Sequence, residues 1–192
     1  MPAPNPQALA FLHNRQSISS KMLGLPVPDR AALMPILQAA ARSPDHGKLE
    51  PWRFIVLERP ALQRLSALAA ERAAALGLDE VQTGKGIAQY GNAGLIVVVV
   101  ASPKASAKVP EIEQILSSGG VCLAMVNAAL ASGWGACWLT GWPAYDRGFV
   151  EQGLGLESRE FVAGVIHIGT PVNLPPDRPR PDLATITTWT DA

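Results

Sequence analysis

Residues 95–101 read LIVVVVA, an uninterrupted run of apolar and mostly β-branched side chains. A run without a polar face predicts a strand that is buried on both sides and lies inside a sheet. Pro103 follows closely and is expected to end that strand. The same reasoning predicts a second interior strand over residues 161–168, and shorter strands over 54–57 and 136–139.

Helical spacing fills most of the chain between these strands. We expect helices near residues 6–13, 29–42, 60–76, 111–132 and 146–153. Pro35 removes a backbone hydrogen bond inside the second helix, so it predicts a kink there or a later start of the helix.

Residues 79–92 are polar and contain Gly84, Gly86 and Gly91. Because glycine is a poor helix former, we expect a mobile loop or a lid in this part of the chain.

Asn127 is the only polar residue between Val121 and Ala131. A helix with so little polar surface is expected to cross the core or a subunit interface. Gly119 and Gly120 lower its helix propensity, which predicts the close approach of another backbone or a ligand.

The tail from Asn173 is rich in proline, which favours extended backbone. We therefore predict one α+β domain over residues 1–192, in which residues 173–192 form an extended arm.

Composition excludes several classes of partner. Sixteen Lys and Arg balance sixteen Asp and Glu, and this zero formal charge argues against nucleic-acid binding. Only 17% of the residues are charged, below the usual quarter, so part of the surface is expected to be an interface between subunits.

The cellular location is predicted from the cysteines and the apolar segments. Cys122 and Cys137 lie in apolar surroundings, which is typical of reduced, buried thiols. The first residues do not form a secretory signal, and 95–101 is too short to span a bilayer. We expect a cytoplasmic protein with no membrane partner.

Several catalytic motifs are missing from the sequence. The third glycine of a dinucleotide motif that began at Gly84 would fall on Gln89, and there is neither a phosphate loop nor a GxSxG elbow. His13, His46 and His167 lack metal-ligand spacing. We therefore expect no metal site.

Two segments combine polar groups in a way that suits anion binding. Arg15-Gln16-Ser17-Ile18-Ser19 joins a guanidinium to two hydroxyls and suits a phosphate, but it is also typical of a solvated loop. Residues 42–54 carry a histidine, a lysine and a carboxylate in one loop, which suits either ligand contact or a capping turn.

Two further segments leave similar alternatives. Trp134, Trp138 and Trp142 suit the wall of a flat aromatic ligand or the packing of a core. Arg178 and Arg180 suit a phosphate clamp or a soluble chain end.

Taken in order, these segments resemble the FMN-dependent nitroreductase family, in particular its short members that are described as NAD(P)H nitroreductases. The resemblance extends from about residue 8 to about residue 185. It rests on RQS at 15–17, ARSPDH at 41–46, PWRF at 51–54, AALASG at 128–133, WLTG at 138–141, GTP at 169–171 and RPRP at 178–181.

The resemblance implies a three-layer fold with a mixed or antiparallel sheet between helices, and an intertwined homodimer with one FMN per subunit at the interface. It also implies FMN contacts and a nicotinamide segment. The implied FMN contacts are Arg15, Gln16, Ser17, Ser19, His46, Glu50, Trp138, Leu139, Thr140, Arg178 and Arg180, and the nicotinamide segment is Ala128, Ala129, Leu130, Ala131, Ser132 and Gly133.

Two positions depart from the family pattern. Many members carry Lys or Arg at the position of Ser19, where a cation stabilises the reduced flavin, so Lys21, Lys48 or backbone N–H groups would have to replace it. Glu50 stands where an amide is common, and its negative charge would disfavour electron-rich flavin.

The activity implied by the resemblance is transfer of a hydride from NADH or NADPH through flavin N5 to a small-molecule acceptor, such as a nitroaromatic or a quinone, in a ping-pong cycle. The cofactor carries the chemistry, so no side chain is predicted to be catalytic. The alternatives are a flavin enzyme of other chemistry (dehalogenation, flavin fragmentation or dehydrogenation) and a non-catalytic ligand-binding dimer. The residues do not distinguish NADH from NADPH.

Overall fold

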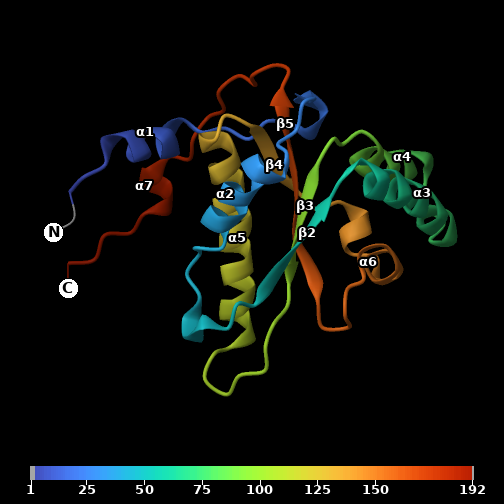
Figure 1. The fold of residues 1–192 in the computed structure, drawn as a ribbon. Coiled ribbons are helices and arrows are strands. Elements are labelled where there is room, and N and C mark those ends of the chain that lie inside the picture. The colour runs from blue at the N-terminus through green and yellow to red at the C-terminus, as the bar shows by residue number, and fades with distance from the viewer. Residues whose placement is uncertain (1–2, 192) are drawn as a thin grey trace.

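The computed structural model describes residues 3–191, and its centre is an antiparallel sheet (Figure 1). β5 pairs with β1, β3 and β4, and β3 also pairs with β2. The strands are β1 (Leu23–Gly24), β2 (Trp52–Leu57), β3 (Ile96–Ala101), β4 (Gly135–Leu139) and β5 (Phe161–Pro171).

β3 is the predicted strand that is buried on both sides. All six of its residues are buried, and it lies between β2 and β5. Its side chains alternate between two cores. Val97 and Val99 face one core, whereas Ile96, Val98 and Val100 face the other.

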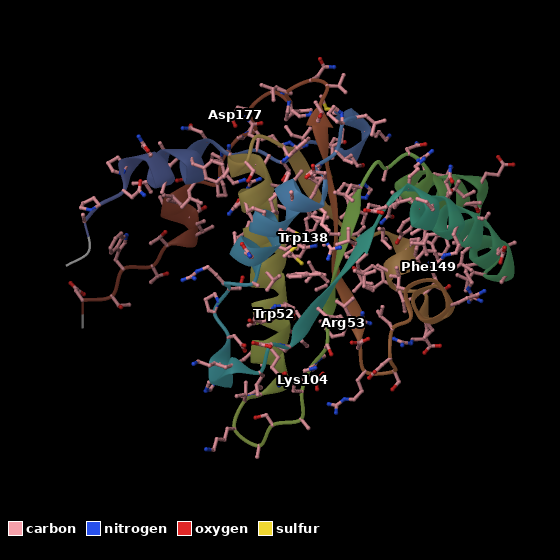
Figure 2. The ribbon with its side chains drawn as sticks, viewed as in Figure 1. Trp52, Arg53, Lys104, Trp138, Phe149 and Asp177 are labelled. Atoms are coloured by element: carbon pink, nitrogen blue, oxygen red, sulfur yellow. The ribbon has the colours of Figure 1, made fainter. Side chains whose placement is uncertain are left out.

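One helical layer covers each face of the sheet (Figure 1). On one face lie α2 (Arg30–Ala40) and α5 (Glu111–Ala131). On the other lie α3 (Arg59–Ala75), α4 (Glu80–Gly91) and α6 (Arg147–Leu154). Figure 2 shows the separation, with Trp138 on the α5 side and Phe149 on the opposite side. The three-layer α+β prediction is confirmed.

The predicted loop over residues 79–92 is wrong, because these residues form helix α4. The Asp79 carboxylate caps the helix by accepting a hydrogen bond from the N–H of Gln82 at 2.7 Å. Tyr90 is fully buried, with its ring 5.2 Å from that of Phe149. Burial of this aromatic pair outweighs the low helix propensity of the glycines.

The glycines of α4 have different surroundings. A Cβ atom on Gly86 would lie 2.6 Å from the ring of Trp142, whereas one on Gly84 would meet nothing within 4 Å. Gly86 therefore permits a close approach of α4 to the segment that follows β4.

The remaining helices match the predictions from the sequence in part. Asp29 caps α2, and this helix begins at Arg30 and includes Pro35, so the later start is wrong. The tail contains a short helix, α7 (Leu183–Ile186), where only extended chain was expected. Together with α1 (Pro6–Asn14), it projects away from the sheet (Figure 1).

α5 packs on the sheet through Val121, Cys122, Met125 and other buried residues, which confirms that it crosses the core. Cβ atoms on its two adjacent glycines would meet side chains only at ordinary distances of 3.8–3.9 Å, so the expected close approach is not made within the described residues. By length and composition, α5 is also the one described helix that is long and apolar enough to cross a membrane.

Both cysteines are buried and free, as expected. Burial raises the pKa of the Cys122 thiol to about 12 and that of Cys137 to about 11. Both thiols are therefore protonated and unreactive at neutral pH.

We predict that Gly86→Ala lowers the free energy of unfolding by about 1–2 kcal/mol, because the new methyl group overlaps the Trp142 ring. That ring is held by a hydrogen bond from its Nε1 to the carbonyl oxygen of Gln82. Gly84→Ala is the matched control, and it should raise stability by up to about 1 kcal/mol through helix propensity alone. Urea denaturation measures both, and equal effects of the two substitutions would contradict the packing argument.

Candidate cofactor site

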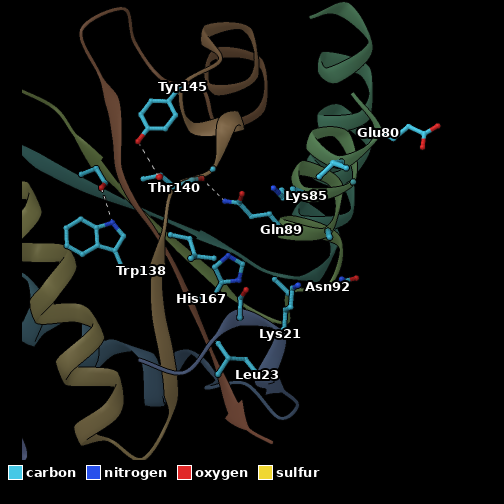
Figure 3. A pocket seen from close by; sticks show the side chains of 18 residues that line it. Lys21, Leu23, Glu80, Lys85, Gln89, Asn92, Trp138, Thr140, Tyr145 and His167 are labelled. Atoms are coloured by element: carbon cyan, nitrogen blue, oxygen red, sulfur yellow. Dashed lines mark hydrogen bonds between the residues drawn. The ribbon is translucent and has the colours of Figure 1, made fainter. Parts of the chain in front are cut away.

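A cavity of about 1200 Å³ lies beside the edge strand β4 (Figure 3). Its walls come from η1 (Ser20–Met22), from α4, from the end of β4 and from β5. The side chains that define its character are Lys21, Lys85, Gln89, Trp138, Tyr145 and His167. α4 thus borders the cavity, although it is a helix and not the predicted loop.

The end of β4 brings Trp138, Leu139 and Thr140 to this cavity. Trp138 and Leu139 remain 42% and 37% exposed, so two large apolar side chains are available to a ligand. Side chains alternate along β4, and the register therefore turns Leu139 toward α4 and Trp138 toward α5. The Trp138 Nε1–H donates to the carbonyl oxygen of Ala163 at 3.2 Å, which fixes the indole.

Hydrogen bonds join the walls around Thr140. Gln89 on α4 donates from Nε2 to the Thr140 carbonyl oxygen at 2.9 Å, and the Tyr145 hydroxyl lies 3.3 Å from Thr140 Oγ1 (Figure 3). These contacts fix the position of α4 relative to the segment that follows β4.

Residues 15–19 run beside β4 as well. The N–H of Ile18 donates to the carbonyl oxygen of Ala136 at 2.9 Å. Arg15 donates from Nη2 to Ser17 Oγ at 3.0 Å, while its buried Nε has no partner among the described residues. Ser19 directly precedes η1, which lines the cavity. The fold therefore brings Ile18 to β4 at Ala136, two residues before the 138–140 segment.

The loop that carries His46 and Glu50 lies elsewhere, at the helix η2 (His46–Lys48), and does not line this cavity. His46 Nδ1 is 2.6 Å from the Glu113 carboxylate on α5. Glu50 has a positive φ of 48°, held by a hydrogen bond from its N–H to Asp45. A single chain does not bring these two residues to residues 138–140.

Two other predicted groups also lie outside the cavity. Arg178 and Arg180 are exposed in the arm, where Arg180 pairs with Asp177 at 2.9 Å. Residues 128–133 form the end of α5 and the turn after it, and Ala129 is buried in the core. Their predicted ligand contacts stay predictions.

The charge at the cavity comes from exposed side chains. Lys21 and Lys85 both line it, together with Glu80. Lys48 lies on η2 instead. Of the two lysines that could compensate for Ser19, Lys21 is the one at the cavity.

His167 is the cavity residue that the sequence reasoning missed, since it considered this histidine only as a metal ligand. It is 3% exposed, and its Nε2 has no hydrogen-bond partner among the described residues. Burial lowers its pKa to about 4, so the imidazole is neutral at pH 7. The available signal was a lone histidine in the apolar stretch FVAGVIHI.

Other charged groups of the fold are structural. Arg53 pairs with Glu160 at 2.7 Å, and this hydrogen-bonded guanidinium lowers the pKa of the Glu160 carboxyl to about 2. Arg72 pairs with Asp146 at 2.7 Å. Within residues 3–191, no group of three His, Cys, Asp or Glu side chains could hold a metal ion.

An antiparallel sheet between two helical layers, with a cavity at its edge strand, is a nitroreductase-like architecture. The fold matches a crystal structure of a nitroreductase-like family protein from Bacillus cereus with a TM-score of 0.78, at 19% identity and with 100% of both chains covered. It also matches a nitroreductase with bound FMN from Bacteroides fragilis with a TM-score of 0.74, at 20% identity, covering 97% of this chain and 100% of the other.

The sequence comparisons identify the family. The model described as "Nitroreductase family" matches residues 12–170. The Escherichia coli (strain K12) protein named "Putative NAD(P)H nitroreductase YdjA" is 36% identical over 164 residues, covering 85% of this chain and 88% of that protein. A Haemophilus influenzae protein named "Putative NAD(P)H nitroreductase" is 34% identical over 165 residues, with the same coverage of 85% and 88%. The chain belongs to the nitroreductase family.

We predict that His167 makes the apoprotein less stable in mild acid. The unfolded chain binds a proton near the ordinary pKa of 6.5, whereas the folded chain excludes it until about 4. Stability is therefore fully present above pH 6.5 and is lost as the pH falls toward 4, by about 2–3 kcal/mol at pH 4.5.

Urea unfolding of the wild type and of His167→Phe at pH 7 and pH 4.5 measures this loss. The variant should lose less stability by about that amount. Glu160 is present in both proteins, so its contribution cancels. An equal loss in the two proteins would show that the folded state does not exclude the proton from His167.

Proposed function

We propose that this protein is an FMN-dependent oxidoreductase that passes a hydride from NADH or NADPH to a small acceptor, such as a nitroaromatic or a quinone. The observation that carries the proposal is that the 15–19 segment bonds to β4 through Ile18 and leads into η1, which lines the cavity together with residues 138–140. The family resemblance assigns both the 15–19 and the 138–140 segments to FMN. The names of the curated relatives support a nicotinamide donor, and the Bacteroides fragilis structure with bound FMN supports the cofactor.

The residues present fit FMN in shape and in polarity. Leu139, which is turned toward α4, offers exposed apolar surface to a flat ring, and Trp138 borders the cavity from the other face of β4. Arg15 has a buried Nε without a partner, which suits an anionic group such as the ribityl phosphate. Lys21 lies at the cavity, where its positive charge would stabilise the reduced anionic ring.

When bound, FMN would accept a hydride at N5 and return it to the acceptor. In our proposal Arg15, Gln16 and Ser17 bind the phosphate, and residues 138–140 orient the ring and exclude water from it. The protein supplies position and charge, so no side chain needs to act as a general acid or base.

We also infer that the working form is a homodimer in the cytoplasm. Three large apolar side chains of α5, namely Ile112, Leu116 and Leu123, are 50–67% exposed and need cover. A second copy would also bring His46 and Glu50 to its neighbour's cavity, and the arm from residue 173 is long enough to contact that copy. We infer that residues 1–192 form one domain whose last part is this arm.

A visible absorption spectrum of the purified protein, with FMN added if it is pale, tests the proposed function. We expect flavin bands near roughly 370 and 450 nm that bleach with NADH or NADPH and recover with an acceptor. A colourless protein that takes up no FMN would overturn the proposal and favour the non-catalytic ligand-binding dimer. Bound flavin that does not bleach would favour other flavin chemistry.

We predict that Arg15→Ala weakens FMN binding by about 1.5–3 kcal/mol, which is the usual contribution of a charged hydrogen bond. Titration of the apoprotein with FMN measures the effect. Arg30→Ala is the matched control, since Arg30 is exposed at the start of α2 and should leave the affinity unchanged. Equal affinity of the Arg15 variant and the wild type would remove Arg15 from the site.

A further inference from the structure

His167 is the innermost polar group of the cavity. It lies on β5, opposite Cys137 on β4 and Ile96 on β3, and the register turns its side chain toward α4 (Figure 3). With an exposed fraction of 3%, it is the most buried of the residues that line the cavity. On the same face of β5, Val165 belongs to the apolar core. The polar ring of His167 is therefore an exception on a face that is otherwise apolar.

The imidazole has hydrogen-bonding capacity that the fold leaves unused. A neutral imidazole has one N–H donor and one acceptor nitrogen. Nε2 of His167 has no partner among the described residues. Buried polar groups are nearly always paired in folded proteins, so an unpaired one requires a reason.

Several other polar groups of the cavity are already engaged, whereas Ser20, Glu80 and Asn92 lie nearer to solvent than His167. Gln89 Nε2 and Trp138 Nε1 donate to backbone carbonyl oxygens, and the Tyr145 hydroxyl contacts Thr140. Lys21 and Lys85 are exposed to solvent. Of the lining residues that are buried, Ala93 and His167, only His167 carries a polar side chain.

Tyr90 is a second buried residue with an unpaired polar atom, but it lies away from the cavity. The Tyr90 hydroxyl is also buried and unpaired, but Tyr90 packs against Phe149 and does not line the cavity. No ligand in the cavity would have access to it. His167 has the same lack of a partner, and although its Nε2 is itself closed to solvent, the residue lies at the wall of a cavity of about 1200 Å³.

We propose that His167 contacts the bound ligand and pairs with the polar edge of a planar heterocycle, which is the flavin ring of FMN under the proposed function. A flavin has one edge of N–H and C=O groups and one apolar dimethylbenzene edge. A lone neutral imidazole among apolar side chains pairs only with the polar edge. His167 thus selects the orientation of the ring, while Leu139, which faces the same side of the sheet, supplies apolar contact.

The inference rests on the proposed function, and FMN titration of four apoproteins separates the two. The proteins are the wild type, His167→Phe, His167→Gln and the control Tyr90→Phe. We expect His167→Phe to weaken FMN binding about tenfold, the effect of losing one buried hydrogen bond. Its apoprotein should be as stable as the wild type or more stable at pH 7, because the unpaired group is gone. His167→Gln should recover most of the affinity, and Tyr90→Phe should bind as the wild type does.

A wild type that binds no FMN overturns the proposed function and the inference with it. A wild type that binds FMN, together with a folded His167→Phe variant within twofold of its affinity, overturns the inference alone.

A measurement on the unmodified protein keeps the inference testable if the variants do not fold. The chain has three histidines, so imidazole signals from ¹⁵N-labelled histidine are few. Addition of FMN should shift the ring nitrogen signals of His167, with the signals of the exposed His13 and His46 as references. Ring signals of His167 that do not move at saturating FMN overturn the inference.

Discussion

The burial of β3 on both faces is the constraint on which the remaining structure depends. Ile96, Val98 and Val100 need one apolar layer, and Val97 and Val99 need another. Each such side chain contributes about 1.5–3 kcal/mol when it is fully removed from water. Helices must therefore cover both faces of the sheet, and β2 and β5 must occupy both edges of β3. The three layers follow from this one strand.

The cavity results from the way these layers end at β4. β4 pairs with β5 only, so its other edge is available, and residues 15–19 run beside it. α4 is held in place by the Tyr90 and Phe149 rings and by the close approach of Gly86 to Trp142. The cavity is thus bounded by segments that the core keeps rigid, which suits the binding of a cofactor that must be held in one orientation.

The family, the fold and the cavity are all consistent with the proposed FMN-dependent oxidoreductase. Membership of the nitroreductase family is shown by the sequence comparisons, and the cavity beside β4 is the region of the fold to which our FMN proposal applies. His167 adds a feature of this chain's own residues, a neutral ring at the inner wall without a partner. In our proposal two chains are needed, since His46 and Glu50 are remote from the cavity of their own chain.

The sequence by itself determined the interior strands, the α+β class and the helix at 111–131, because each depends on a local pattern of apolar and turn-forming residues. It failed at α4, where propensity indicated a loop but the burial of Tyr90 and the packing of Gly86 stabilise a helix. Only the tertiary structure decided that residues 15–19 meet β4, that His46 and Glu50 do not, and that His167 lies unpaired at the cavity. The reason is physical: spacing along the chain specifies which face of an element a side chain occupies, but hydrogen-bond partners and cavity walls come from segments distant in sequence.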